Sequence, residues 1–550
     1  MVYRSPIPDI HIPEQDIYHV LLEHPTQSTS DDARLFIDGT TNIGHTFDDL
    51  RRLTKQFAGA LQVNFNAQRG QVLALYSPNS IDYPVVAFGA LAAGLVVTTA
   101  NAAYTASELT FQLRDASASF LVADYAALDT AVEAATRAGI PRHHIIVAGI
   151  IDGAAREQQH RGHHTVYSFL ATSSECTPVR LTAREAATQT AYLCYSSGTT
   201  GQPKGVELTH RNILANVFQY AAFEHEHWKR LPARDVLVGF LPFYHIYGLT
   251  VLIHVSIHRR VPVIVMRRFQ LDTFLQHVER YRITMAYVAP PVCLALAKDP
   301  LVDRHDLSSL REVLSGAAPL GPALAAAVRT RLGILVRQAS GMSETSPVTM
   351  VPLADSVVDG SVGQLLPNMT AKVIDEHGRE VAPGDAGELC VRGPNVMKGY
   401  LNNPTATANM IDADGYLHTG DVVRVDAAGD FYIVDRIKEL IKYKGYQVAP
   451  AELEAILQTH EAIADAAVVP VQSEALATEL PRAYVALKPS HVGAVTAEEV
   501  AQYVAQHVAP HKQLRGGVEF LDVVPRSPSG KILRKLLRGQ ANEKKPLAKI

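Results

Sequence analysis

Residues TAYLCYSSGTTGQPKGVELTH (190–210) place a loop rich in glycine, serine and threonine between two strand-like runs. Glycines let backbone N–H groups turn toward an anion, and Lys204 adds a positive charge, so the loop predicts a phosphate site. Its spacing is not that of the P-loop G-x-x-x-x-G-K-[ST], because Pro203 stands where that pattern, counted from Gly198, requires glycine. The loop also opens into a strand, with a helix predicted only from about Arg211. On composition alone, a polar turn without a ligand stays an alternative.

The chain around this loop alternates strand-like and helix-like runs, as in QVLALYS (71–77) followed by PVVAFGALAAG (84–94). This alternation predicts parallel sheets covered by helices. Between about 361 and 435, short strands separated by Gly, Pro and Asp turns predict a smaller, largely antiparallel β unit. After Arg436 the pattern is that of a compact α+β segment, with a boundary expected near residues 435–438.

Composition narrows the class of protein. The chain has 550 residues, 47% of them apolar and 19% charged, which indicates a globular protein of several domains or subdomains. A net charge of −4 argues against a nucleic-acid binder, although residues from Arg436 onward carry 16 basic and 12 acidic side chains. The four cysteines are scattered, with no CxxC pair, and this fits a reducing compartment.

The chain offers few targeting signals. Its most apolar run, VVAFGALAAGLVV (85–97), has 13 residues and is too short for a membrane span. The first residues, MVYRSPIPDI, contain no secretory signal. The final residues Ala548-Lys549-Ile550 repeat the small–basic–aliphatic pattern of the S-K-L address, so we expect a peroxisomal import receptor as a partner and a cytoplasmic location otherwise.

Five further motifs accompany the loop. They are SGAAPLG (315–321), QASGMSET (338–345), YLHTGD (416–421), YIVDRIKELIKYKGYQVAPAELE (432–454) and PRSPSGKILRK (525–535). With the loop, these motifs identify the chain as similar to the adenylate-forming superfamily, which includes acyl-CoA synthetases, beetle luciferases and the adenylation domains of nonribosomal peptide synthetases. The wording of LPFYHIYGLT (241–250) and of the last two motifs most resembles the plant 4-coumarate:CoA ligases.

The resemblance implies an α/β fold. We expect a large N-terminal domain of two parallel-type α/β sheets with a small β-barrel-like subdomain at about 361–435, together making an adenylation core over 1–435. A small, mobile α+β lid domain is expected over 436–550, with its hinge near Lys438.

The resemblance also implies an ATP- and Mg²⁺-dependent reaction in two steps. A small-molecule carboxylic acid attacks the α-phosphate of ATP to give an acyl-adenylate and pyrophosphate, and the thiol of CoA then displaces AMP. An aromatic or medium-length acid is expected. The carboxylate Glu344, with the hydroxyl of Thr200, matches the Mg²⁺ ligands, and hard oxygen donors suit that ion.

The resemblance implies that residues of the loop and of the later motifs contact the nucleotide and CoA. They are Ser196, Ser197, Gly198, Thr199, Thr200, Gly201, Lys204, Gly316, Ala317, Ala318, Ser340, Gly341, Met342, Ser343, Asp421, Arg436, Lys444, Gly445 and Gln447. Asp421 matches the carboxylate that takes both ribose hydroxyls, because two acceptor oxygens suit two vicinal donors.

Three residues match catalytic positions. Lys531 matches the lysine that bridges the carboxylate and the α-phosphate, Lys442 a residue near the thiol, and His245 a gate that admits the thiol. The lid is expected to swing about Lys438 between the two steps, replacing Lys531 by the face that carries Lys442. The acid pocket is expected to include Tyr244, His245, Gly316, Gly341, Pro347 and Val348, the small residues leaving room for a flat ring or an alkyl chain.

One position departs from the family pattern. Ser340 stands where the relatives carry an aromatic residue beside adenine. A stacked aromatic side chain contributes about 1–3 kcal/mol per base in nucleic-acid systems, so its loss predicts weaker ATP binding.

Other functions stay open. An adenylation enzyme that loads a carrier protein, a luciferase-like monooxygenase and a non-catalytic relative are the alternatives. His225 and His227, in EHEHW, are expected in a solvated loop rather than in a metal site, since spacing of two residues does not place both on one helix face.

Overall fold

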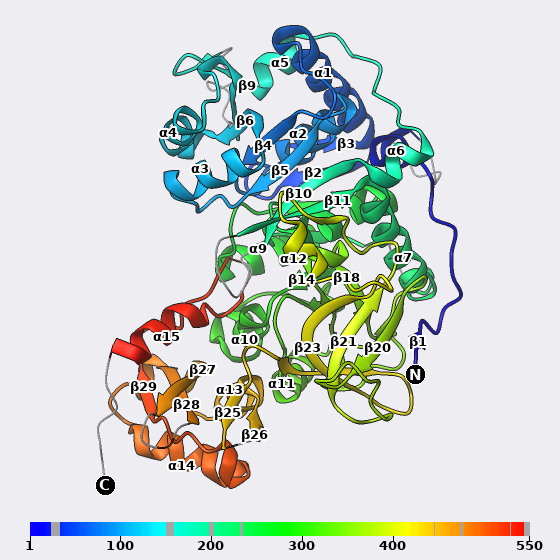
Figure 1. Cartoon of the computed structure of the whole chain (residues 1–550). Helices are drawn as coiled ribbons and strands as arrows, with labels where there is room; N and C mark the ends of the chain where they lie inside the picture. The colour runs from blue at the N-terminus through cyan, green and yellow to red at the C-terminus, as the bar shows by residue number, and fades with distance from the viewer. Residues whose placement is uncertain are drawn as a thin grey trace.

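Figure 1 shows the chain as a computed structural model. The structure describes residues 1–23, 33–149, 159–196, 203–231, 235–444, 446–473, 476, 478–528 and 530–543. Within this part of the chain, no helix is long and apolar enough to cross a bilayer.

The largest sheet has nine strands and contains the start and end of the phosphate-type loop. In spatial order its strands are β22 (Gly399–Tyr400), β11 (Lys204–Thr209), β10 (Thr190–Ser196), β5 (Val96–Ala100), β4 (Val72–Tyr76), β6 (Ala118–Asp124), β7 (Ile145–Ala148), β9 (His163–Thr165) and β8 (Gln159–His160). Pairing from β10 through β5, β4 and β6 to β7 is parallel, whereas β10–β11 and β11–β22 are antiparallel.

Helices follow the strands in the order that the alternating pattern predicts. They are α1 (Phe47–Phe65), α2 (Asp82–Ala92), α3 (Ala106–Asp115), α4 (Leu128–Ala138), α5 (Val166–Thr172), α6 (Ala183–Thr188) and α7 (His210–Lys229). Thr209 caps α7, its hydroxyl accepting from the Asn212 N–H, which explains why the helix begins directly after β11.

The second α/β sheet has seven strands. They are β16 (Leu335–Gln338), β15 (Glu312–Ser315), β14 (Met285–Val288), β12 (Leu237–Gly239), β13 (Val263–Val265), β2 (Arg34–Asp38) and β3 (Gly44–Thr46). All neighbours from β16 to β2 run parallel. Its helices include α8 (Val255–Arg259), α9 (Leu271–Tyr281), α10 (Pro290–Lys298) and α11 (Pro322–Leu332).

The β unit expected near 361–435 is an antiparallel sheet of five strands. They are β1 (Tyr3–Arg4), β20 (Thr370–Ile374), β21 (Gly387–Arg392), β23 (Leu417–Val425) and β24 (Phe431–Arg436). The first of these comes from the chain's N-terminus, which the sequence pattern did not indicate. A small sheet of β17 (Ser340–Gly341), β18 (Val348–Val351) and β19 (Gln364–Leu365) joins this unit to β16.

The C-terminal segment is α+β and has its own apolar cores. Its elements are β25 (Ile441–Tyr443), β26 (Tyr446–Val448), α13 (Pro450–Thr459), β27 (Ile463–Ser473), β28 (Thr478–Leu487), α14 (Ala497–His507), β29 (Val518–Phe520) and α15 (Arg534–Glu543). Leu453, Val468 and Val485 are fully buried in one of these cores. In Figure 1 this segment lies at the lower left, beside α10 and α11 of the large domain.

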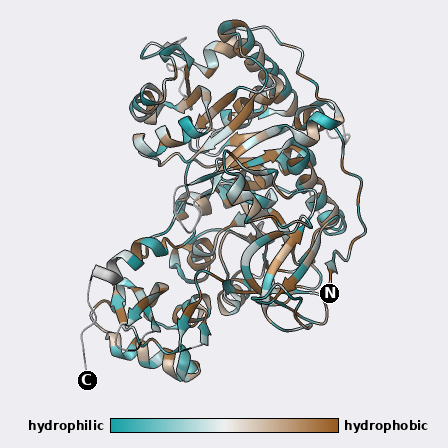
Figure 2. Ribbon diagram, viewed as in Figure 1, coloured by the Kyte–Doolittle hydropathy of each residue, from teal (hydrophilic) through white to brown (hydrophobic). Residues whose placement is uncertain are grey.

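Hydropathy follows the layers. Figure 2 shows apolar ribbon concentrated on the inner strands and polar ribbon on outer helices such as α3 and α4. One continuous core runs through both α/β sheets and into the antiparallel unit, so the large domain is packed as a single body. The predicted α/β class is therefore confirmed.

One local prediction was wrong. His225 and His227 belong to the last turns of α7, not to a solvated loop. The helix continues because Phe223 and Glu224 are buried, and both carboxylate oxygens of Glu224 bind the guanidinium of Arg337. His227 Nε2 lies 2.9 Å from a carboxylate oxygen of Glu312, so this histidine is tied to the second α/β sheet.

Candidate active site

The phosphate-type loop joins two antiparallel strands. Ser196 at the end of β10 is paired with Lys204 at the start of β11. The predicted contacts Ser197, Gly198, Thr199, Thr200 and Gly201 lie outside the described residues. The adjoining strand is held by Tyr195, whose hydroxyl donates to Asp115 at the end of α3 over 2.6 Å.

A tyrosine that the sequence did not single out connects this loop to Glu344. Tyr400, on the edge strand β22, is paired with Val206 of β11. Its hydroxyl donates to Glu344 Oε1 over 2.8 Å, and the Lys204 ammonium lies 4.8 Å from the centre of its ring. Glu344 is 6% exposed, and Lys204, Glu344 and Tyr400 therefore form one cluster.

Backbone at the carboxyl ends of β15 and β16 forms the next part of the site. Gly316, Ala317 and Ala318 follow β15, and Ala317 has a positive φ of 69°. The side-chain oxygen of Gln338 accepts from the Leu320 N–H over 3.1 Å and fixes this turn against β16. Strand ends at a common edge of a parallel sheet are a usual place for ligands.

The segment after β16 carries the predicted nucleotide contacts Ser340, Gly341, Met342 and Ser343. Ser340 is partly buried, and its carbonyl accepts from the Thr349 hydroxyl over 3.0 Å. Met342 donates its N–H to the Pro347 carbonyl over 3.1 Å, and this bond closes the segment onto the start of β18, where Val348 is buried.

The two glycines expected in the acid pocket are required by close neighbours. A Cβ on Gly341 would lie 2.1 Å from the Pro347 carbonyl oxygen. A Cβ on Gly316 would lie 2.9 Å from the Tyr247 ring. The missing side chain of each glycine therefore leaves room for neighbouring protein atoms, the Pro347 carbonyl and the Tyr247 ring, rather than for the acid. The spacing of the sequence did not reveal this constraint.

Tyr244 and His245 lie before the buried helical run that begins at Gly248. The Tyr244 carbonyl accepts from the Thr99 hydroxyl over 2.8 Å, which anchors the pair to β5. Burial, with a smaller contribution from the Lys531 ammonium, lowers the pKa of His245 to about 3. His245 is therefore neutral near pH 7, and its Nδ1 accepts from the Tyr247 N–H over 3.3 Å.

Asp421 and Arg436 face each other across β23 and β24. They are directly paired in register, and the Arg436 Nε donates to Asp421 Oδ1 over 3.0 Å. Burial raises the pKa of Asp421, and the charge of Arg436 opposes that shift.

Lys531 reaches this pair from the C-terminal segment. A turn holds it, in which the Ser527 N–H donates to the Lys531 carbonyl over 2.8 Å and the Lys531 N–H donates to the Ser527 hydroxyl over 3.1 Å. Gly530 in this turn has a φ of 87°, and a Cβ there would lie 2.8 Å from that of Ala289 at the start of α10. The lysine loop is therefore pressed against the large domain.

The Lys531 ammonium shares its surroundings with both kinds of charge. Burial lowers its pKa, and Arg436 lowers it further, whereas the carboxylates Glu344 and Asp421 raise it. Two carboxylates and two cations from two domains thus lie within electrostatic reach of one another. Such a cluster can hold a polyanion between fixed charges.

Other predicted residues are not brought into this cluster. Lys442 and Gln447 are paired in the β25–β26 hairpin, and both are exposed. Lys438 is exposed just after β24, and Lys444 has a positive φ of 46° in the hairpin turn. Gly445 lies outside the described residues, as do Ala548, Lys549 and Ile550.

Contacts between the domains hold Lys531 in this arrangement. The Lys298 ammonium at the end of α10 donates to the Gln458 carbonyl near the end of α13 over 2.8 Å. At the start of α11, a Cβ built on Gly321 would lie 3.3 Å from that of Ala455.

Comparison with family models gives two matches. The AMP-binding enzyme family matches residues 22–401, and the AMP-binding enzyme C-terminal domain matches residues 452–531.

Several curated proteins are similar over nearly their full length. The 4-coumarate–CoA ligase of Pinus taeda is 38% identical, covering 98% of this chain and 97% of the relative. The 4-coumarate–CoA ligase 1 of Petroselinum crispum is 37% identical with the same coverage.

Among solved structures, ATP-bound MatB from Rhodopseudomonas palustris aligns with a TM-score of 0.84 at 26% identity, covering 96% of this chain and 98% of the other. The apo structure of the same protein gives a TM-score of 0.73 over the same coverage. The anthranilate–CoA ligase AuaEII in complex with anthranoyl-AMP shares the fold, with a TM-score of 0.84 at 22% identity, covering 97% of this chain and 98% of the other.

Proposed function

The chain belongs to the AMP-binding enzyme family, and from this premise we propose that it is an AMP-forming acid–CoA ligase. Its acid substrate is an aromatic acid similar to 4-coumarate or a medium-chain carboxylic acid, and its other substrates are ATP and CoA. The observation that carries the proposal is the position of Lys531, which is buried near the charges of Glu344 and Asp421 of the large domain and of Arg436 at the end of β24.

In the first step, an oxygen of the acid attacks the α-phosphorus of ATP, and the bond to the pyrophosphate oxygen breaks. Two anions must meet, so positive charge is needed where they approach. Lys531 supplies a compact ammonium on a flexible stem, which suits contact with the carboxylate and the α-phosphate together. Arg436 adds a second cation 3.0 Å from Asp421.

Asp421 is assigned to the ribose. It lies on a strand in the middle of the antiparallel sheet, and Arg436 binds one of its oxygens, Oδ1. Within the part of the chain that the structure describes, no donor binds its Oδ2, so that oxygen can accept a ribose hydroxyl. Lys204 and the loop it closes are assigned to the β- and γ-phosphates.

Glu344 fits the binding of Mg²⁺. Tyr400 fixes one of its oxygens, and among the described residues no donor binds the other, Oε2. A free carboxylate oxygen in a buried position is a ligand that a hard cation prefers, and the ion would neutralise phosphate charge. Thr200 is proposed as a second ligand.

The second step needs a different arrangement. CoA attacks the acyl carbon, the bond from that carbon to the phosphate oxygen breaks, and AMP leaves. Lys442 and Gln447, the residues assigned to this step, are exposed on the hairpin, so the small domain must turn about Lys438 to bring them in. The higher TM-score with ATP-bound than with apo MatB supports an arrangement suited to the first step.

The class of acid rests on the relatives and on the pocket. The relatives named as 4-coumarate–CoA ligases cover 98% of the chain. We assign Tyr244, His245 and Val348 to the acid pocket, and burial keeps the imidazole of His245 neutral near pH 7. This environment favours an uncharged acyl body.

Acid-dependent exchange of pyrophosphate into ATP tests the proposal. A panel of cinnamates, benzoates and fatty acids is assayed with and without CoA, and the CoA thioester is measured by mass spectrometry. We expect exchange with at least one cinnamate or medium-chain acid and thioester formation on addition of CoA. Exchange without a thioester would overturn the ligase assignment, and no exchange with any acid would overturn adenylation itself.

A further inference from the structure

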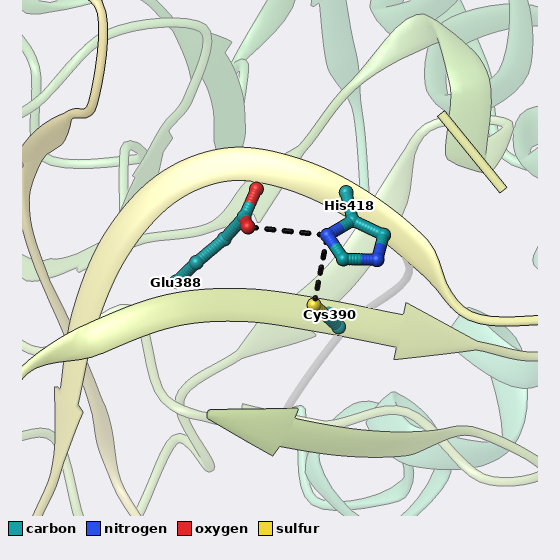
Figure 3. A group of neighbouring side chains, drawn as sticks. All are labelled: Glu388, Cys390 and His418. Atoms are coloured by element: carbon teal, nitrogen blue, oxygen red, sulfur yellow. Dashed lines mark hydrogen bonds and ion pairs between the residues drawn. The ribbon is translucent and has the colours of Figure 1, made fainter. Parts of the chain in front are cut away.

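A group of metal-ligating side chains lies on the antiparallel sheet, outside the cluster described above. Glu388 and Cys390 lie on β21, and His418 lies on the neighbouring strand β23 (Figure 3). Cys390 and His418 are directly opposite each other, and Glu388 precedes Cys390 by two residues. Alternate residues of a strand share a face, so all three side chains leave the same side of the sheet.

The three side chains are already close together. His418 Nδ1 lies 3.1 Å from Glu388 Oε2 and 3.5 Å from Cys390 Sγ. One ligand atom from each residue fits within 4.8 Å of the others. Tetrahedral zinc, with bonds of about 2.0 Å to N and O and about 2.3 Å to S, separates its ligands by roughly 3.3–3.8 Å. The two distances from His418 Nδ1 are therefore already close to this spacing.

A carboxylate lies near the other ring nitrogen of His418. Asp412 Oδ2 lies 3.7 Å from His418 Nε2, on the side of the ring away from the cluster. Carboxylates that contact the second nitrogen of a metal-binding histidine fix its ring and raise its basicity. Among the described residues, no other group of three His, Cys, Asp or Glu side chains meets the same distance criterion.

The positive charge nearest the cluster is already paired. Lys372 lies opposite Cys390 on β20, but its ammonium binds Asp412 Oδ2 over 2.9 Å and lies 4.4 Å from the centre of the Tyr416 ring. Lys372 is therefore held by Asp412, and the carboxylate of Glu388 stays available to a cation that displaces the thiol proton.

Access and donor type indicate which ion fits. Cys390 is fully buried, whereas the side chains of His418 and Glu388 are 30% and 21% exposed, so water can complete the coordination from the solvent side. Thiolate and imidazole donors select zinc and similar transition ions over Mg²⁺. We propose that Glu388, Cys390 and His418 form a binding site for a divalent transition-metal ion, Zn²⁺ by preference, separate from the Glu344 position.

Such an ion would join β21 to β23 just before Asp421. Glu388 Oε1 accepts from the Gly420 N–H over 3.2 Å, so ligation through Oε2 leaves this bond in place. Because the ion binds only the folded arrangement, it should raise the melting temperature of the protein as its concentration exceeds the dissociation constant.

Cobalt is the probe for the test, since a thiolate bound to Co²⁺ gives a near-ultraviolet charge-transfer absorption. Full-length protein without an affinity tag is dialysed against chelator and titrated with Co²⁺, then with Zn²⁺. We expect one equivalent to produce the absorption and Zn²⁺ to abolish it by displacement. Absence of the absorption in the wild-type protein would overturn the proposal.

Variants identify the ligands. Cys390→Ser should lose the absorption and weaken Zn²⁺ binding at least tenfold in calorimetry, whereas Cys176→Ser, the matched control, should keep both. An unchanged absorption in Cys390→Ser would contradict the assignment.

A second variant guards against misfolding of Cys390→Ser. Glu388→Gln keeps an amide oxygen for the Gly420 N–H but removes the charged ligand, and we expect Zn²⁺ affinity to fall at least tenfold without loss of the circular-dichroism spectrum. Glu376→Gln, in an exposed pair 3.8 Å from His377, is its control and should leave the affinity unchanged. Equal affinities in Glu388→Gln and wild-type protein would overturn the site.

Discussion

Two lysines of the C-terminal domain, Lys531 and Lys442, are in opposite situations. Lys531 lies in a turn that touches Ala289 of the large domain, and its pKa is lowered by burial and by the charge of Arg436. Lys442 lies in an exposed hairpin, where its N–H and carbonyl are bound by Glu479 and Thr478 of the same domain. The difference teaches that one arrangement of the domains serves only one of these lysines, so the proposed two-step reaction requires both arrangements.

The largest effect is expected from removing the ammonium group of Lys531. Lys531→Ala should lower acid-dependent ATP–pyrophosphate exchange by at least about 10²-fold, since loss of one preorganised charge-stabilising group commonly costs that much. Thioester formation from chemically prepared acyl-AMP should be largely retained. Lys442→Ala should show the reverse pattern, and equal losses in both assays for both variants would remove the distinction between the two lysines.

A smaller loss is expected on the large-domain side of the cluster. Tyr400→Phe removes the hydrogen bond to Glu344, which as a bond to a charged group contributes about 1.5 kcal/mol, so exchange should fall about tenfold. Titration with Mg²⁺ should show a raised requirement for the ion. Tyr432→Phe, whose hydroxyl binds Asp426 on the exposed edge of the sheet, is the control and should behave as wild type.

The affinity for ATP should increase when Ser340, which we propose lies beside adenine, is replaced by an aromatic residue. Ser340→Tyr restores a stacking surface worth about 1 kcal/mol at the lower end of its range, so KM for ATP should fall about fivefold. Steady-state kinetics with saturating acid measures this change. An unchanged or higher KM would contradict the idea that Ser340 weakens ATP binding.

Weakening the contact between domains should change the balance of the two steps by a smaller factor. Lys298→Ala removes the bond to the Gln458 carbonyl near the end of α13, and a loss of about 0.7 kcal/mol would lower the equilibrium constant for this arrangement about threefold. Exchange should fall accordingly, without a loss in thioester formation from acyl-AMP. Lys512→Ala, whose ion pair with Glu452 lies within the small domain, should change neither rate.

The pH dependence of ATP–pyrophosphate exchange tests the role of Lys531 without replacing this residue. The folded-state pKa of Lys531 is lowered, so its ammonium is lost as pH rises through a value below the ordinary 10.5. ATP–pyrophosphate exchange should therefore fall as the pH rises through the lowered pKa of Lys531, before pH 10.5 is reached. Arg436→Gln removes a charge that lowers this pKa, so the alkaline limb should move to higher pH. A limb that stays in place would show that another group titrates.

Much of the fold could be predicted because its signals are local. Alternating apolar runs indicated the parallel sheets, and the helix expected from about Arg211 begins one residue earlier, at His210. The contribution of Tyr3 and Arg4 to the antiparallel sheet could not be predicted, since two residues show no strand periodicity and their partners, Ala371 and Thr370, are distant in the sequence. His225 and His227 were misplaced because the burial of Glu224 depends on Arg337, 113 residues away.

The site shows the same limit. Motif resemblance supplied Lys531, Asp421 and Glu344, but it gave no indication of Tyr400, whose contact with Glu344 exists only because β22 adds to the edge of β11. The reason for Gly316, a nearby Tyr247 ring, was equally hidden. Contacts between segments distant in the sequence determine the roles of Tyr400 and Gly316. The spacing of residues along the chain does not reveal such contacts.

Locking the domains in the present arrangement tests the central claim most directly. Gly321→Cys combined with Ala455→Cys places two Cβ atoms about 3.3 Å apart across the interface, close to the separation in a disulfide. We expect the oxidised double variant to retain ATP–pyrophosphate exchange and to lose at least tenfold in thioester formation, with recovery on reduction. Thioester formation at the wild-type rate in the oxidised protein would contradict the requirement for a second arrangement.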